Sequence, residues 1–169
     1  MDVKFKASTF EFLCCRVTQA AANTILVAIY HPGSQPTSTT FFEEFFRLFE
    51  LLATYAASVT ITGEINIHFE LTTDIDTGKL KEALTSFGFD QFVSSPTHEL
   101  GAILDIIITP CDHQPEDVTV VDVGLSDHML VSWSVNMAPP LPDYVTTTRR
   151  SWRTFKSVDF ISRLRSTAL

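Results

Sequence analysis

Apolar and polar residues alternate or cluster along the chain in runs that predict both strands and helices. Six runs of strand length are rich in β-branched and aromatic residues: 9–17, 24–30, 58–62, 103–109, 118–123 and 129–135. A short polar segment separates the first two, which predicts an antiparallel hairpin. The fourth run is almost continuously apolar, so we expect its strand to be covered on both faces.

Two further segments have the period of amphipathic helices. In residues 41–55 the apolar positions fall on one face, and Thr40 followed by Glu43 predicts a capping box. Further along, four apolar residues at helical spacing precede Gly88, a typical helix end: Leu80, Ala83, Leu84 and Phe87. Strands mixed with two helices predict an α/β domain in which the helices pack on a sheet.

The length and composition are those of one globular domain. The 169 residues are 45% apolar and include 14 Phe. No apolar run approaches the roughly 20 residues that cross a bilayer. Residues 1–6 lack the pattern of a signal peptide, and the three cysteines form no Cys-x-x-Cys pair. We therefore expect an intracellular protein, in the nucleus or cytoplasm, with reduced cysteines and no membrane partner.

The last thirty residues differ from the rest in charge and composition. Residues 140–169 hold six basic and two acidic residues, a net +4, whereas the preceding 139 residues hold six basic and eighteen acidic, a net −12. Prolines near 138–142 predict a stiff linker between a domain at 1–137 and a basic tail at 138–169, with a short helix at 159–164. The acidic domain suits a cation-dependent phosphodiesterase but lacks the basic stripe typical of proteins that bind duplex DNA.

Candidate chemistry first appears where the strand at 58–62 ends. Gly63 lets the backbone turn sharply, so that Glu64 and Asn66 can face a common crevice. An acid there can orient or deprotonate a water, and an amide can hydrogen-bond a phosphate oxygen. Gly-Glu-x-Asn also occurs in ordinary polar turns, which is the alternative interpretation.

Two more acids and a histidine accompany later strands. Asp105 lies among five aliphatic residues, where burial would require a partner, and His128 suits that role. Asp127 can ligate a hard divalent cation through oxygen while His128 meets a phosphate. The alternatives are an edge-strand Asp105 that faces solvent, and a loop with an aspartate cap and a satisfied histidine at 127–128.

Taken together and in this order, these residues resemble the endonuclease/exonuclease/phosphatase superfamily, and more narrowly the endonuclease domain of LINE-type (non-LTR) retrotransposon polyproteins. The resemblance runs from Phe10 to Val135. Tyr30-His31-Pro32-Gly33 is similar to that family's strand ending in Tyr-Arg-Pro, and Ser95-Pro96-Thr97-His98 with Leu104-Asp105 is similar to its Pro-Thr-His and Leu-Asp segment. The fold this implies is a truncated α/β sandwich of the endonuclease/exonuclease/phosphatase type.

The resemblance also implies catalytic roles. Glu64 occupies the position of an aspartate that aligns or activates the attacking water, and Asn66 that of a residue that holds the phosphate. Asp105 would orient His128. His128 would then stabilise the charged phosphoryl transition state.

Ligands and partners follow from the same resemblance. Asp127 and Glu64 would hold Mg²⁺, Tyr30 would contact a phosphate, and the substrate would be DNA. Residues 149–153 look like the linker that leads towards a reverse transcriptase. A zinc enzyme is not expected, because no ligand spacing connects the five histidines: His31, His68, His98, His113 and His128.

Three departures from the family pattern bear on activity. Glu64 replaces an aspartate, and its extra methylene moves the carboxylate by about 1 Å, a misplacement that can cost about a hundredfold in rate. His31 stands where an arginine usually follows Tyr30, which weakens a basic phosphate contact. The family's N-terminal third, with an Asn and the principal metal-binding Glu, has no counterpart here, so we expect exposed strand edges, self-association and a decayed, inactive copy.

Two other functional classes remain open at this point. The chain could be an active phosphoesterase on a smaller substrate, with another acid replacing the missing metal ligand. It could instead be a non-catalytic interaction module that uses its strand edges or its arginine-rich tail.

Overall fold

The structure is a computed structural model that describes residues 5–19, 22–55, 58–135 and 155–166. The chain divides into two compact units, Met1–Pro139 and Pro140–Leu169. The second unit contains helix α3 (Ser157–Ser166), so the short helix predicted at 159–164 is confirmed. The predicted proline-rich linker and the arginines at 149–153 lie outside the described residues.

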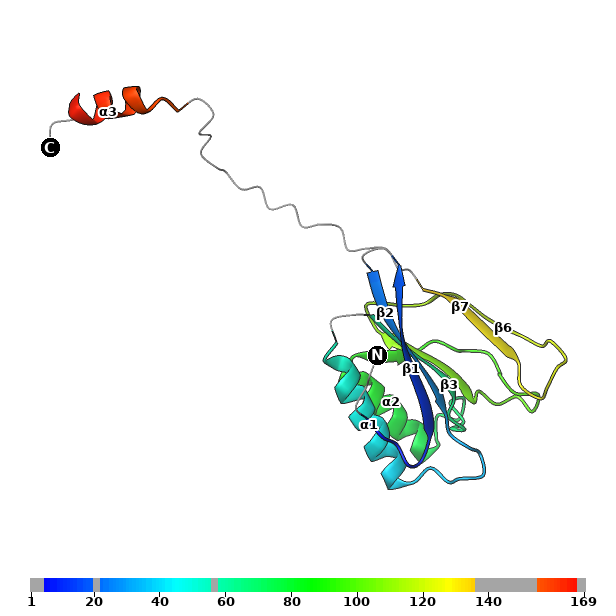
Figure 1. Cartoon of the computed structure of the whole chain (residues 1–169). Coiled ribbons are helices and arrows are strands. Elements are labelled where there is room, and N and C mark those ends of the chain that lie inside the picture. The colour runs from blue at the N-terminus through cyan, green and yellow to red at the C-terminus, as the bar shows by residue number, and fades with distance from the viewer. Residues whose placement is uncertain (1–4, 20–21, 56–57, 136–154, 167–169) are drawn as a thin grey trace. The chain divides into compact units, whose positions relative to one another are not determined.

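A five-stranded sheet forms the centre of the first unit (Figure 1). Its strands lie in the order β1-β2-β3-β5-β4: β1 (Glu11–Gln19), β2 (Ala22–Tyr30), β3 (Ser58–Glu64), β5 (Asp105–Pro110) and β4 (Phe89–Gln91). β1 and β2 form the predicted antiparallel hairpin, β2 pairs parallel with β3, and β5 pairs antiparallel with β3 and β4. β4 was not predicted, because its three residues are too few to show a periodic pattern.

Helices α1 (Thr39–Ala53) and α2 (Ile75–Phe87) pack on one face of this sheet, as the sequence predicted (Figure 1). The predicted Thr40 cap is wrong: Ser38, in extended conformation, accepts a 3.1 Å hydrogen bond from the Phe41 backbone N–H. Thr40 already lies inside the helix, so its backbone is not extended as a cap requires. α2 ends as predicted at Gly88, whose φ of 72° is left-handed.

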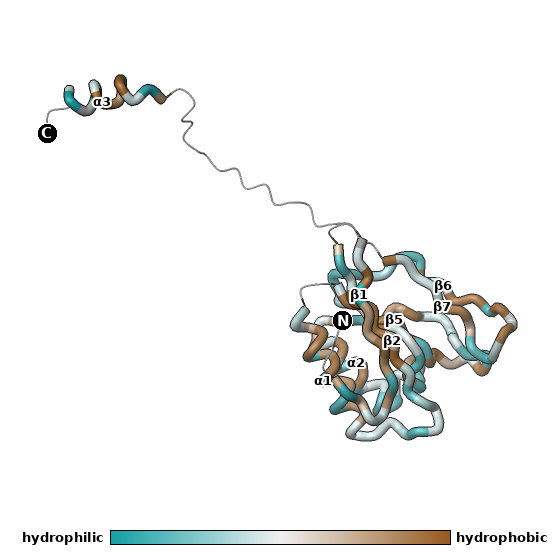
Figure 2. Tube along the Cα trace, in the orientation of Figure 1, coloured by the Kyte–Doolittle hydropathy of each residue, from teal (hydrophilic) through white to brown (hydrophobic). Residues whose placement is uncertain are grey.

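The main core lies between these helices and the sheet, and it is rich in aromatic residues. Figure 2 shows apolar residues concentrated along α1 and the strands. Phe45 and Phe49 are fully buried with ring centroids 5.0 Å apart, and Phe89 meets Phe49 at 5.1 Å. Ile25 and Ile61 close the core from the sheet side.

The opposite face of the sheet is covered only in part. The hairpin of β6 (Glu116–Val121) and β7 (Leu130–Ser134) packs there on a second cluster that includes Ile107. β5 is therefore buried on both faces, as predicted, whereas Leu13 of β1 is 70% exposed on the same face as Ile107. The result is a mixed α/β fold, which confirms the predicted class. No helix in the described ranges is long and apolar enough to cross a membrane.

Candidate functional site

Three of the predicted site residues form a row across adjacent strands. Tyr30 at the end of β2 is in register with Glu64 at the end of β3, and Glu64 is in register with Asp105 at the start of β5. Residues in register on neighbouring strands project from the same face. The sheet therefore brings the phenol and both carboxylates to one edge, on the face that points away from the helices.

Gly63 fixes the position of this row. Its φ is 128°, and a Cβ at this position would lie 2.0 Å from the carbonyl oxygen of Ile29 on the neighbouring strand. Only glycine allows β2 and β3 to approach this closely. The sharp backbone path expected at Gly63 is thus confirmed, and it presents Glu64 at the strand end.

Asn66 holds the Glu64 carboxylate. Asn66 has a left-handed φ of 53°, a conformation that asparagine tolerates better than most residues. Its Nδ2 donates to Glu64 Oε1 at 2.6 Å and to the His31 carbonyl oxygen at 2.7 Å. Because both partners are hydrogen-bond acceptors, the NH₂ group of Asn66, and not its side-chain oxygen, must face them. Both hydrogens of that NH₂ group are thus engaged within the protein. In this structure Asn66 positions the acid.

The side chain of His31 is part of the core and does not reach the site, although its carbonyl oxygen bonds Asn66. The residue is 1% exposed and its ring packs 4.5 Å from that of Phe41. Its Nδ1 lies 3.1 Å from the Ile65 carbonyl oxygen, to which it donates. Burial lowers the pKa of His31 although that hydrogen bond opposes the shift. The buried His31 ring therefore does not offer a basic group where the family pattern has an arginine.

Asp105 and His128 form the pair expected from the sequence. Asp105 Oδ2 lies 2.9 Å from His128 Nδ1, which fixes the tautomer, and His128 Nε2 faces Glu64 Oε1 at 3.7 Å. Burial would lower the pKa of His128, but the hydrogen bond and charge of Asp105, with the charges of Glu64 and Asp127, raise it. The imidazole is therefore biased towards its cationic form beside two carboxylates.

Two loops hold this pair in place. The Thr97 hydroxyl, fully buried, accepts hydrogen bonds from the backbone N–H groups of Leu104 and Asp105, at 3.0 and 3.1 Å. The Thr97 carbonyl accepts from the Met129 N–H at 2.8 Å, next to His128. Ser126 closes the second loop, because its hydroxyl accepts from the His128 N–H at 3.1 Å.

Asp127 and His98 extend the site to solvent. Asp127 has a 60% exposed side chain, and its Oδ2 lies 3.5 Å from His98 Nε2. In the described part of the chain, potential metal-ligand atoms cluster in two groups: Glu64, Asp105 and His128, and His98, Asp127 and His128. Glu64 and Asp127, which the resemblance pairs as Mg²⁺ ligands, thus belong to different groups that share His128.

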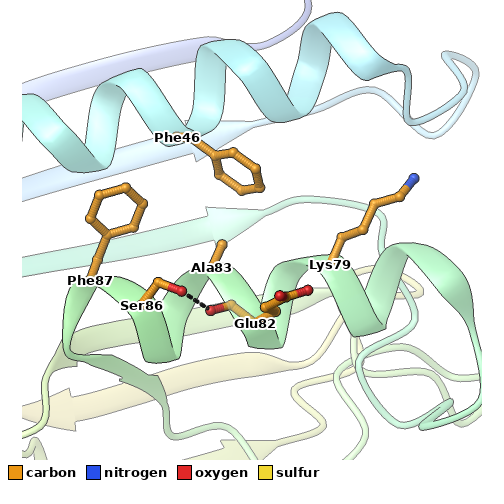
Figure 3. A pocket seen from close by; sticks show the side chains of 6 residues that line it. All are labelled: Phe46, Lys79, Glu82, Ala83, Ser86 and Phe87. Atoms are coloured by element: carbon orange, nitrogen blue, oxygen red, sulfur yellow. Dashed lines mark hydrogen bonds between the residues drawn. The ribbon is translucent and has the colours of Figure 1, made fainter.

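A pocket elsewhere on the molecule has no such chemistry. It lies between α1 and α2, on the helix side of the sheet, and has a volume of about 280 Å³ (Figure 3). Its lining mixes aromatic and polar side chains: Phe46, Lys79, Glu82, Ala83, Ser86 and Phe87. Lys79 is paired with Asp76 at 3.0 Å, and the Ser86 hydroxyl bonds the Glu82 carbonyl within the helix. We therefore place the candidate site at the strand ends.

Comparison with solved structures shows that the fold is that of the endonuclease/exonuclease/phosphatase proteins. The endonuclease domain of TRAS1, a telomere-specific non-LTR retrotransposon, matches with a TM-score of 0.64 at 16% identity, over 75% of this chain and 62% of that one. A 3′ phosphatase, NExo, from Neisseria matches with a TM-score of 0.51 at 17% identity, over 73% and 64% of the two chains.

An endonuclease/exonuclease/phosphatase family protein from Leptotrichia buccalis also matches, with a TM-score of 0.53 at 9% identity, over 78% and 62%. The chain thus spans less than two thirds of the length of these three structures. No family model and no curated protein matches the sequence.

Sequence reasoning missed the parts played by Thr97 and His98. Both lie in the Pro-Thr-His segment that carried part of the resemblance, but no role was assigned to them. The available signal was that Thr97 directly follows Pro96 in a turn, where a threonine hydroxyl often bonds backbone groups. That His98 meets Asp127 could not be foreseen, because the contact depends on how two separate loops pair.

Proposed function

We propose that this site is built for the cation-dependent hydrolysis of a DNA phosphodiester, as in target-site nicking by a non-LTR retrotransposon. The observation that carries the proposal is the arrangement of His128 between Asp105 on Nδ1 and Glu64 facing Nε2. A cationic imidazole held by a carboxylate is suited to a phosphate oxygen on which negative charge develops. The likeness to the TRAS1 domain supports DNA as the substrate and an intracellular place of action.

The residues present offer ligands that suit a hard divalent cation such as Mg²⁺. Carboxylate oxygens are the ligands that this ion prefers, and Asp127 offers them in the cluster with His98 and His128, while Glu64 offers them in the cluster with Asp105 and His128. When bound, the cation would supply positive charge next to the phosphate and its leaving oxygen. Asn66 holds the Glu64 carboxylate in a fixed orientation, which suits an acid that orients or deprotonates a water.

We further propose that hydrolysis is largely lost in this chain because Glu64 reaches too far. Its Oε1 lies 3.7 Å from His128 Nε2, a separation that leaves no room for a phosphoryl group and a water between the two. An aspartate would withdraw the carboxylate by about 1 Å or more, which matters because catalytic geometry tolerates little displacement. The interpretation as a decayed endonuclease rests on this crowding.

Nicking of supercoiled plasmid with Mg²⁺ or Mn²⁺ tests both proposals. We expect no nicking by the native chain, measurable nicking by Glu64→Asp, and none when Glu64→Asp is combined with His128→Ala or Asp127→Ala. Nicking by the native chain that Asp127→Ala abolishes would overturn the proposed loss of activity. A folded, metal-binding Glu64→Asp variant that never nicks DNA would contradict the proposed site.

Phosphate esters smaller than plasmid DNA test the alternative function, a phosphoesterase that acts on a smaller substrate. The 3′ phosphatase among the structural matches favours including a 3′-phosphorylated oligonucleotide beside the plasmid. Release of phosphate by the native chain, without plasmid nicking and dependent on His128, would favour a phosphoesterase over an endonuclease.

We also propose that the chain associates with itself through the open part of the sheet. β1 is an edge strand of nine residues, and Leu13 and Val17 on its open face are 70% and 40% exposed. Apolar strands at a sheet edge are ready to pair with another copy. Sedimentation velocity over a range of concentrations measures this directly.

A further inference from the structure

His98 lies close to the carboxylate of Asp127, and the proposed mechanism assigns it no role. Its side chain is 15% exposed, and its Nε2 lies 3.5 Å from Asp127 Oδ2. An antiparallel backbone bridge joins His98 to His128, and their rings meet edge to face with centroids 5.0 Å apart. The loop of His98 is thus fastened to the loop that carries Asp127.

The backbone decides which ring nitrogen of His98 carries the hydrogen. The Leu100 N–H donates to His98 Nδ1 at 3.2 Å. A nitrogen that accepts a hydrogen bond uses its lone pair, so the neutral ring carries its hydrogen on Nε2. That hydrogen is on the nitrogen that faces the Asp127 carboxylate.

The same tautomer argues against a transition-metal site at His98, Asp127 and His128, although these three ligand atoms lie within 4.8 Å of one another. Nε2 could bind a metal only as a bare lone pair, with the hydrogen moved to Nδ1. The Nδ1–H would then oppose the Leu100 N–H, two donors facing each other. His98 is therefore built as a donor to Asp127.

We propose that His98 is a positioning residue that holds the Asp127 carboxylate for a divalent cation by donating from Nε2. This inference rests on the proposed function, because Asp127 is the cation ligand there. The 3.5 Å separation is longer than a formed hydrogen bond, and contacts of this kind often shorten when a site is loaded. Asp127 is the most exposed acid of the site, so it gains most from a fixed neighbour.

Direct binding of Mn²⁺, measured by electron paramagnetic resonance without any nucleic acid, tests the proposal. His98→Phe keeps a ring to pack against His128 but removes the donor, and we expect about tenfold weaker Mn²⁺ binding, in the range found when partners of metal ligands are removed. His98→Gln places an amide N–H near the former Nε2 and should restore most of the affinity. Asp127→Asn should bind no better than His98→Phe.

A matched histidine provides the control. His113 stands beside Asp112, with 2.9 Å between Nδ1 and Oδ1, in an exposed loop. His113→Phe should leave Mn²⁺ binding and the melting temperature unchanged. Equal Mn²⁺ affinity of the native chain and His98→Phe, with both folded, would overturn the role of His98. Absence of plasmid nicking by every variant would contradict only the proposed endonuclease, since Mn²⁺ binding is measured separately.

Discussion

The two faces of the central sheet have different compositions and different tasks. On one face α1 and α2 bury an aromatic core in which Phe41, Phe45 and Phe49 are fully enclosed. On the other, the β6–β7 hairpin covers only the part around Ile107. The covered face stabilises the fold. The strand ends on the other face carry Tyr30, Glu64 and Asp105, and His128 joins them from the loop before β7. The core and the candidate site thus lie on opposite faces of the same sheet.

Removing an aromatic ring from the covered face has the largest expected effect. Phe49→Ala should lower the free energy of unfolding by about 4 kcal/mol, because Phe49 is fully buried and touches the rings of Phe45, Phe87 and Phe89. Urea denaturation followed by circular dichroism measures the change. A loss below about 1 kcal/mol would mean that the helices are not packed as described.

The second largest loss of stability is expected when Gly63 is replaced. Gly63→Ala should cost about 3 kcal/mol, because the new Cβ meets the Ile29 carbonyl oxygen and φ is positive. Gly101→Ala is the matched control, since its φ is also positive, at 89°, but no atom lies within 4 Å of the added Cβ. The control should cost about 1 kcal/mol in the same urea experiment. Equal losses for the two variants would remove the argument for close strand approach.

Low pH should weaken the contact between α1 and the segment that precedes β1, because this contact depends on the ionised carboxylate of Glu44. Burial would raise the pKa of Glu44, but hydrogen bonds from the hydroxyls and backbone N–H groups of Ser8 and Thr9 lower it to about 2. A lowered pKa in the folded state adds stability above the unfolded value of 4.5, and that stability disappears as pH falls towards 2. Glu44→Gln should therefore be less stable than the native chain by about 1 kcal/mol at pH 7.

Denaturation at several pH values checks this prediction. The difference between the native chain and Glu44→Gln should shrink between pH 4.5 and 2. Glu43→Gln, on the exposed side of the same helix, serves as the control and should show no such convergence. A difference that persists unchanged at pH 2 would rule out the ionised carboxylate as its source.

The smallest effect on stability is expected on the open face. Leu13→Thr should change the free energy of unfolding by less than about 0.5 kcal/mol, because the side chain is 70% exposed and threonine suits a strand. The same substitution should reduce the proposed self-association in sedimentation velocity. A large loss of stability would show that this face is covered in solution, and the contrast between the two faces would then fail.

The features that the sequence predicted correctly are mainly those that depend on burial. The period of residues 41–55 predicted α1, and the continuous apolar run predicted the buried β5, because burial leaves a pattern in the sequence. Asp105 within that run pointed to a partner, and His128 is that partner. These features depend on local periodicity or on the high cost of an unpaired buried charge.

What the sequence did not predict depends on contacts between loops. Three such features are the Ser38 cap, strand β4 and the burial of His31. In each case several neighbouring residues could take the role, and only the packing of the structure decides which one does. The approach of His98 to Asp127 depends on a bridge between segments about thirty residues apart. The catalytic roles of Tyr30, Glu64, Asn66, Asp105, Asp127 and His128 remain predictions.

The parallel pairing of β2 with β3 also sets an order of events during folding. Tyr30 and Glu64 are neighbours in the sheet but are separated in the chain by the whole of α1. Such long-range pairs close slowly, because the loop entropy is lost before the contacts form. The β1–β2 hairpin and the helices can form early, while the row of Tyr30, Glu64 and Asp105 has to wait for the crossover. The ring resonances of His128 should therefore reach their native positions only in the last kinetic phase of refolding.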